Sequence, residues 1–260
     1  MNMPHLPVKS LRLKKVQTEN LILAIHFLLL KKCEIFDEKT IVTCYTGRSM
    51  RIKVRKHERR GYQSIKMSNI LEKQFLKQRN DFEKSCVERN KKYHFPQGVI
   101  FETDIAYAKD KNKAHRLDRY RPKGKEAQIL PVIINVHGGG LLLGNKEFNK
   151  YFCALLSKKG FLVYSMEYRL IPDCTFFDQL RDIFLAMDFV KEHAAADGGD
   201  LSHVYLVGDS GGACLVTYAN AIQNSKKIAK AAGVKPSELK VHALGLISGM
   251  FYTAKFDKIG

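Results

Sequence analysis

The sequence lacks the features of disulfide-rich and metal-binding proteins. It contains no C-x-x-C pair, and its cysteines are few and widely spaced: Cys33, Cys44, Cys86, Cys153, Cys174 and Cys214. This spacing favours reduced, mostly buried thiols in a cytoplasmic protein over a disulfide framework or a zinc site. The nine histidines show no ligand spacing either. We therefore expect no metal and no cofactor.

Long apolar runs are also scarce. Leu21–Leu30 is a ten-residue apolar stretch that contains His26 and is followed by two lysines. A membrane-spanning helix needs about 20 residues, and a signal peptide would show small residues before its cleavage point. The stretch predicts a buried or partner-packed helix and no membrane contact, with a membrane or export role as the alternative.

Acidic residues are outnumbered, with 26 Asp and Glu against 44 Lys and Arg, and the net charge is +18. Residues 1–66 hold 15 basic and 5 acidic residues (+10), which leaves 29 and 21 (+8) for residues 67–260. The basic cluster at 51–60 contains no aromatic residue for base stacking, so it predicts a solvated basic face, and nucleic-acid binding is the weaker alternative. Residues 1–66 are interpreted as a basic N-terminal extension, and Met67 as a possible true start.

Apolar residues make up 45% of the chain, enough for a sizeable core. Residues 69–92 predict a charged helix with apolar positions that include Phe82 and Val87. Beyond it, strand-like and helix-like segments alternate, which predicts an α/β fold with a doubly wound, mostly parallel sheet. The expected strands are Val99–Tyr107, Leu117–Arg121, Pro131–His137, Phe161–Tyr168, Val204–Val207 and Val241–Ser248. The expected helices are 148–156, with Gly160 as its cap, 176–190 and Ala213–Ala232.

Two glycine-rich motifs follow expected strands. His137-Gly138-Gly139-Gly140 comes after the third strand, and Gly208-Asp209-Ser210-Gly211-Gly212 lies between a strand and a helix. The second motif fits G-x-S-x-G, in which a nucleophilic serine occupies a sharp turn that requires small neighbours. Glycines in the first allow backbone N–H groups to turn toward a developing oxyanion. Ser210 is therefore the candidate nucleophile, and Gly138, Gly139 and Gly211 are the candidate oxyanion donors.

With a third motif, Glu167-Tyr168-Arg169-Leu170-Ile171-Pro172-Asp173, the sequence resembles the hormone-sensitive-lipase-type esterases and lipases of the α/β-hydrolase fold. The resemblance covers about residues 67–260. It implies hydrolysis of a small-molecule ester through an acyl-enzyme on Ser210. It also implies that residues 67–96 form a helical cap over a core of residues 97–260. His137, Gly140, Gly208, Asp209 and Gly212 would be structural motif residues, and Tyr168-Arg169 a scaffold turn.

The sequence departs from this family downstream of Ser210. The family places an acid and then a histidine after the nucleophile. Here the later acids are Glu238 and Asp257, and the only later histidine, His242, precedes Asp257 and is interpreted as structural. We therefore expect a core that is incomplete at its C-terminus, with uncertain turnover. Residues 241–248 would then form an apolar sheet edge, which predicts poor solubility or oligomerisation.

The sequence also permits three other interpretations. A chymotrypsin-like protease also contains Gly-Asp-Ser-Gly-Gly, but it needs upstream histidine and aspartate in an all-β fold. A hydrolase-fold protein that binds a small molecule without catalysis, or a pseudoenzyme fragment, fits the missing acid and base. Asp178, Asp182 and Asp188 lie along one expected helix and are interpreted as surface charge rather than metal ligands.

Overall fold

The computed structural model describes residues 69–251, so the expected extension at 1–66, the apolar run at 21–30 and Asp257 lie outside the described residues. Along the chain the elements are α2 (Asn69–Asn90), β1 (Val99–Ala106), β2 (Arg116–Pro122), β3 (Leu130–Val136), the 3-10 turn η1 (Lys146–Asn149), α3 (Lys150–Lys158), β4 (Leu162–Met166), α4 (Phe176–His193), β5 (Gly199–Asp209), α5 (Gly211–Gln223), α6 (Lys226–Ala232) and β6 (Ala243–Ile247).

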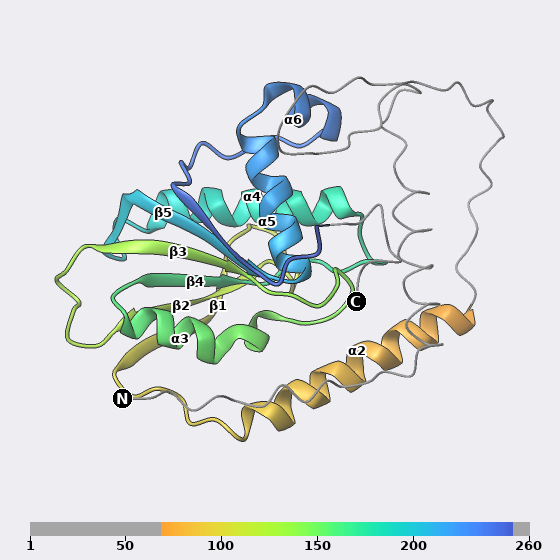
Figure 1. Ribbon diagram of the computed structural model, residues 1–260, viewed down its shortest axis with the longest axis horizontal. Helices are drawn as coiled ribbons and strands as arrows, with labels where there is room; N and C mark the ends of the chain where they lie inside the picture. The colour runs from red at the N-terminus through yellow and green to blue at the C-terminus, as the bar shows by residue number, and fades with distance from the viewer. Residues whose placement is uncertain (1–68, 252–260) are drawn as a thin grey trace.

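The strands form one sheet in the order β1-β2-β4-β3-β5-β6. The four strands β4, β3, β5 and β6 run parallel, because helices make the crossovers between them. β1 and β2 pair antiparallel, and β2 pairs antiparallel with β4. The predicted α/β fold class is confirmed, with an antiparallel hairpin added at one side of the parallel strands (Figure 1).

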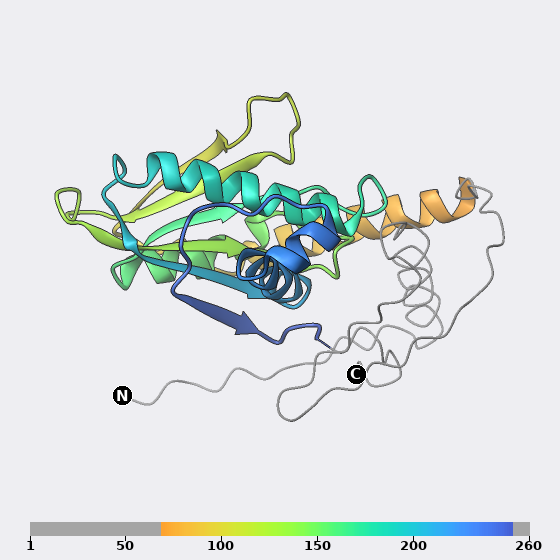
Figure 2. The same ribbon diagram turned by 90° about the horizontal axis from the view of Figure 1, so that it is seen from above.

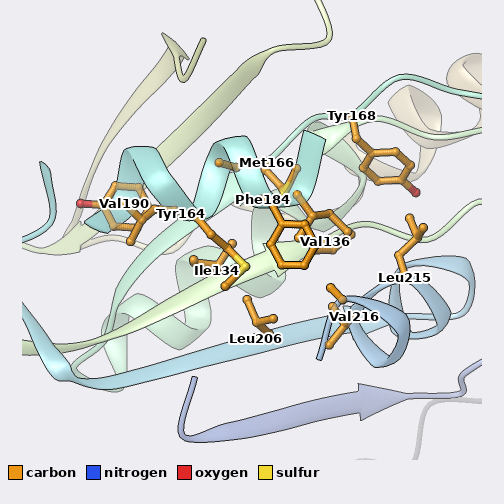
Figure 3. Packing of buried hydrophobic residues seen from close by; sticks show 14 of the residues in the cluster. Ile134, Val136, Tyr164, Met166, Tyr168, Phe184, Val190, Leu206, Leu215 and Val216 are labelled. Atoms are coloured by element: carbon orange, nitrogen blue, oxygen red, sulfur yellow. The ribbon is translucent and has the colours of Figure 1, made fainter. Parts of the chain in front are cut away.

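Helices cover both faces of the sheet because successive strand residues point to opposite sides. On one face Ile133 and Val163 pack with Cys153 and Ala154 of α3. On the other face the larger cluster joins strand residues to α4 and α5 (Figure 3). Its members include Ile134, Val136, Tyr164, Met166, Leu206, Ile183, Phe184, Leu215 and Val216. Figure 2 shows β6 at the edge of the sheet beyond β5.

Two helices differ from expectation. The single helix predicted at 213–232 is two helices, α5 and α6, because the chain turns at Asn224 and the Ser225 side chain accepts the N–H of Ile228 as an N-cap. In α3 the small residues Cys153 and Ala154 are buried, whereas Leu155 is 55% exposed. Small side chains let the helix approach the sheet closely, which an apolar spacing pattern does not reveal.

The interpretation of the α4 aspartates as surface charge is wrong for Asp182. Asp178 forms a capping box with Thr175 at the start of α4. Asp182 is fully buried, and only Asp188 is exposed. A buried carboxylate requires partners, and Asp182 has them in Arg169 and His115.

The helix predicted at 69–92 is α2. Among the described side chains of this helix, Cys86 is buried, whereas Val87 is exposed to solvent. The four cysteines within residues 69–251 are free and buried, as expected; Cys33 and Cys44 lie outside the described residues. Within the same part of the chain, no helix combines the length and the hydropathy needed to cross a membrane.

Candidate active site

Ser210 occupies a strained turn between β5 and α5. Its φ is 48° and its ψ is −114°, a conformation that is costly for a residue with a side chain. The turn is held through its backbone. The Ser210 N–H donates to the carbonyl of Ile247 at 2.9 Å, and its carbonyl accepts the N–H of Met250 at 3.2 Å. The end of β6 therefore fixes the backbone on which the serine side chain stands.

The glycines on either side of Ser210 let the backbone segments approach one another. We call residues 208–212 the elbow. A Cβ on Gly212 would lie 2.2 Å from the carbonyl oxygen of Val136, and a Cβ on Gly208 would lie 2.6 Å from the carbonyl carbon of Gly212. These distances are too short for any side chain. The elbow thus packs α5 directly against the end of β3.

The second glycine-rich segment follows β3, and we call residues 137–144 the glycine loop. The His137 carbonyl accepts the hydroxyl of Tyr168 at 2.7 Å. The Gly138 N–H donates to Oδ1 of Asp209 at 3.0 Å, and the same oxygen accepts Nδ2 of Asn149 at 2.7 Å. Gly138, an expected oxyanion donor, thus has its N–H donated to a carboxylate beside the nucleophile.

The next peptide groups of the loop are arranged differently. The Gly139 carbonyl accepts the N–H groups of Leu142 and Leu143. Within residues 69–251, no acceptor takes the N–H groups of Gly139, Gly140 or Gly211. A Cβ on Gly211 would lie 3.0 Å from the Leu141 nitrogen and 3.1 Å from the Gly140 nitrogen, so this turn lies against the residue that follows Ser210. The positive φ values of Gly139 (129°) and Gly140 (63°) make this turn possible.

Glu167, directly after β4, supports the glycine loop through its contact with the His137 side chain. Its Oε1 contacts Nε2 of His137 at 2.9 Å, and its Oε2 accepts the N–H of Lys146 at 2.9 Å. The His137 ring is fully buried, stacks on Tyr168 with ring centroids 4.3 Å apart, and places Nδ1 2.8 Å from the Gly138 carbonyl oxygen. His137 is therefore a member of the loop's hydrogen-bond network.

Electrostatics follow from this burial. Desolvation by itself lowers the pKa of His137, but the nearby Glu167 carboxylate outweighs it and the pKa is raised. Burial raises the pKa of Tyr168 well above its ordinary value, so its hydroxyl stays a donor. The loop is thus held by the Tyr168 hydroxyl and by two carboxylates, those of Glu167 and Asp209.

A further layer fixes the 167–169 segment. Asp182 of α4 accepts Nη2 of Arg169 at 2.6 Å and the N–H of Arg169 at 3.0 Å, and it contacts Nε2 of His115 at 3.1 Å. The sequence did not indicate this role, because Arg169 and His115 are far from Asp182 along the chain. In the sequence, only the Glu167-Tyr168-Arg169 motif indicated that this segment has a structural role.

α2 reaches the same region through a single arginine. Nε of Arg79 donates to the Leu142 carbonyl at 2.9 Å, Nη2 donates to the Ile171 carbonyl at 2.7 Å, and Nη1 pairs with Asp173 at 2.7 Å. Arg79 thus joins α2 to the end of the glycine loop and to the turn after β4. The sequence pattern of α2 gave no sign of this contact.

Residues 69–251 place no histidine ring in a hydrogen bond with the Ser210 hydroxyl. His242 instead accepts the N–H of Val204 through Nδ1 at 3.3 Å, in the middle of β5, which is consistent with a structural histidine. In the same residues, no group of three or more His, Cys, Asp or Glu side chains is arranged to hold a metal ion. The described residues thus bring a serine on a strained turn close to the glycine loop, and the N–H groups of Gly139, Gly140 and Gly211 have no acceptor among them.

Known proteins that are similar to this chain in sequence include esterases. The chain is 31% identical over 114 residues to an isoprenylcysteine alpha-carbonyl methylesterase of Arabidopsis thaliana, covering 44% of this chain and 26% of that protein. It is 30% identical over 111 residues to a versiconal hemiacetal acetate esterase of Dothistroma septosporum, covering 42% of this chain and 34% of that protein. The chain thus spans about a third or less of these relatives.

Among solved structures, the chain resembles esterase B of Lactobacillus rhamnosis in an inhibited form, with a TM-score of 0.69 and 26% identity. The match covers 74% of this chain and 62% of that one. The BD-FAE family model matches residues 117–250, slightly more than half of the 260 residues and the part that contains both glycine motifs. The chain therefore belongs to the BD-FAE family and has the fold of the α/β-hydrolase esterases.

Proposed function

We propose that this chain hydrolyses carboxylic esters through an acyl-enzyme on Ser210. One observation carries the proposal: a serine held at a positive φ between a strand and a helix lies close to the glycine loop, and no described residue accepts the N–H groups of Gly139, Gly140 and Gly211. Such a strained turn costs free energy and is found where function requires it. The esterase relatives support the same chemistry and a small-molecule ester as substrate.

The proposed reaction begins when the Ser210 hydroxyl attacks the ester carbonyl. The carbonyl oxygen gains negative charge and is stabilised by the N–H groups of Gly139, Gly140 and Gly211. In this donor set Gly140 replaces Gly138, because the Gly138 N–H is donated to Asp209. The alcohol then leaves with a proton, and water hydrolyses the acyl-serine to release the acid.

Attack by a serine needs a group that accepts its proton. Within residues 69–251 no histidine is bonded to the Ser210 hydroxyl, and this observation favours a second candidate, a hydrolase-fold protein that binds an ester without turning it over. Covalent labelling and turnover are therefore measured separately. Labelling with turnover indicates an esterase, and ester binding with neither indicates a binding protein.

We also propose the domain division expected from the sequence, with residues 67–96 as a cap and 97–260 as the core. The contacts of Arg79 with the carbonyls of Leu142 and Ile171 support a cap that lies against the glycine loop. A cytoplasmic location stays a prediction from the cysteine pattern.

The test is labelling of the full chain by a fluorophosphonate probe, followed by peptide mass spectrometry. We expect one labelled residue, Ser210, and no labelling of the Ser210→Ala variant. The matched control is Ser202→Ala, which removes an exposed hydroxyl on the same strand and should label like the unsubstituted protein. Labelling that survives in Ser210→Ala, or that is absent from the unsubstituted protein, contradicts the proposal. Hydrolysis of short-chain aryl esters, measured in parallel, reports turnover.

A further inference from the structure

Both ring nitrogens of His137 face oxygen atoms that accept hydrogen bonds. Nδ1 lies 2.8 Å from the Gly138 carbonyl oxygen, and Nε2 lies 2.9 Å from Oε1 of Glu167. A neutral imidazole has one donor and one acceptor nitrogen, so one of these contacts would place a lone pair against an oxygen. Only the doubly protonated imidazolium donates to both.

Both oxygens of the Glu167 side chain have hydrogen-bond partners. Besides the His137 ring, its carboxylate accepts the N–H of Lys146 at 2.9 Å and the N–H of Tyr168 at 3.3 Å. Donors directed at both oxygens stabilise a carboxylate. The buried pair is therefore an imidazolium and a carboxylate, and each has hydrogen bonds beyond the ion pair itself, as a buried pair requires.

The Nδ1 contact has a consequence for the backbone. The Gly138 carbonyl belongs to the same peptide unit as the Gly139 N–H. In a trans peptide the C=O and the N–H point in opposite directions. A ring that holds the Gly138 carbonyl on one side therefore directs the Gly139 N–H to the other side, away from His137. Two glycines in sequence would otherwise let this peptide rotate.

We propose that Glu167 is a positioning residue that keeps His137 doubly protonated, and that the imidazolium fixes the Gly138–Gly139 peptide with the Gly139 N–H directed at the Ser210 site. The catalytic part of this inference rests on the proposed function. Its structural content, a buried imidazolium that orients one peptide, stands on the two distances alone.

The charged and titratable groups that face His137 come from two strands. From the end of β4 these are Glu167 and the stacked Tyr168, whose hydroxyl donates to the His137 carbonyl. From the end of β5 it is Asp209, whose charge also favours the imidazolium. Because burial acts in the opposite direction, removal of the Glu167 charge leaves desolvation to lower the His137 pKa.

The first test reads the charge directly. Nitrogen-15 NMR of histidine side chains in the full chain, assigned with a His137→Gln variant, distinguishes doubly from singly protonated rings. We expect His137 to be doubly protonated at pH 7 and to lose its proton at lower pH in Glu167→Gln. The backbone N–H signal of Gly139 should shift with the same midpoint as the ring. A singly protonated His137 in the unsubstituted protein at pH 7 overturns the proposal, and so does a Gly139 signal that does not follow the ring.

The second test uses the rate of Ser210 labelling by the fluorophosphonate. Complete loss of one oxyanion donor costs about 10²–10³-fold in rate. We expect Glu167→Gln to label about 10-fold more slowly at pH 8, and to approach the rate of the unsubstituted protein as the pH falls and the ring regains its proton. Glu167→Asp, which keeps the charge, should retain more of the rate than Glu167→Gln.

The control is Glu147→Gln, which removes one carboxylate charge from the neighbouring 3-10 turn, where Glu147 contacts Lys146 and Lys150 but not His137. Its labelling rate should match that of the unsubstituted protein across this pH range. A loss in Glu167→Gln that is equal at every pH indicates a merely structural role and contradicts the proposal. Absence of labelling in the unsubstituted protein refutes the esterase function alone, since the NMR measurement still reads the ring and the peptide.

Discussion

The elbow and the glycine loop are both rich in glycine, yet they are held in opposite ways. In the elbow the glycines remove side chains, so that α5 can contact the end of β3 through bare backbone. In the loop the glycines free the backbone, and polar side chains from other elements then fix it: Tyr168, Glu167 and Asp209. The elbow is thus sensitive to added atoms, and the loop is sensitive to lost hydrogen-bond partners.

The residues that support the glycine loop are therefore close to it in space but about 30 residues away along the chain. Glu167 and Tyr168 precede Arg169, which is paired with the buried Asp182 of α4. The elbow instead depends on direct backbone contacts with the end of β3 and with the end of β6. Substitutions in the two regions should therefore differ in mechanism as well as in size.

The largest effect should come from the layer beneath the loop. Asp182→Asn leaves Arg169 and His115 without their buried carboxylate, and removal of one partner of a buried ion pair costs about 3–5 kcal/mol. We expect a value near the lower end, because the Arg169 side chain is 30% exposed and can be partly solvated. Urea unfolding monitored by circular dichroism measures the change.

The matched control is Asp188→Asn, an exposed aspartate on the same helix. Its free energy of unfolding should stay within about 0.5 kcal/mol of the unsubstituted protein. Equal losses in the two variants would show that Asp182 does not support the 167–169 segment as the structure indicates.

The next effect should come from the elbow. Gly212→Ala puts a Cβ 2.2 Å from the Val136 carbonyl oxygen and 2.6 Å from that of His137, so α5 must move away from β3. Overpacking of this kind costs about 1–3 kcal/mol, and we expect the upper end because both neighbours are backbone. Labelling of Ser210 should fall together with stability.

Gly98→Ala is the comparison for the elbow. Gly98 has a φ of 78° with no atom within 4 Å of an added Cβ, so its substitution costs only the conformational strain of about 1–2 kcal/mol. Thermal unfolding of both variants separates the steric cost from the conformational cost. If Gly98→Ala is the more destabilising, close packing does not govern the elbow.

The smallest effect should come from a single hydroxyl of the loop's support. Tyr168→Phe removes the donor to the buried His137 carbonyl, and leaving a buried acceptor unsatisfied costs about 1–3 kcal/mol. We expect about 1 kcal/mol, because the ring and its stacking on His137 remain. Chemical unfolding provides the measurement. In Tyr205→Phe, where the hydroxyl bonds to no residue within 69–251, stability should not change by a comparable amount.

Much of the fold followed from local pattern. The β-branched run at Pro131–His137 predicted a buried strand, which the structure places at Leu130–Val136, and α2 and α4 began close to where expected. The apolar spacing pattern gave wrong predictions where tertiary packing or a helix cap outweighs it. Leu155 fits the apolar stripe of α3 but faces solvent, and the run at 213–232 is broken by the Ser225 cap. Asp182 is polar in sequence and buried in structure, since charge alone does not show whether a partner is near.

Residue types and their spacing specify the order of the functional groups along the chain: glycines after β3, and a serine between small residues after β5. Strand ends and turn requirements are local, so residue types and spacing express them. The assembled fold sets the hydrogen-bond partners of the peptide groups in the glycine loop. The Gly138 N–H is taken by Asp209, 71 residues away, and the Gly138 carbonyl by a histidine that Glu167 holds. Such contacts form between segments that are brought together when the sheet assembles, and no spacing along the chain encodes them.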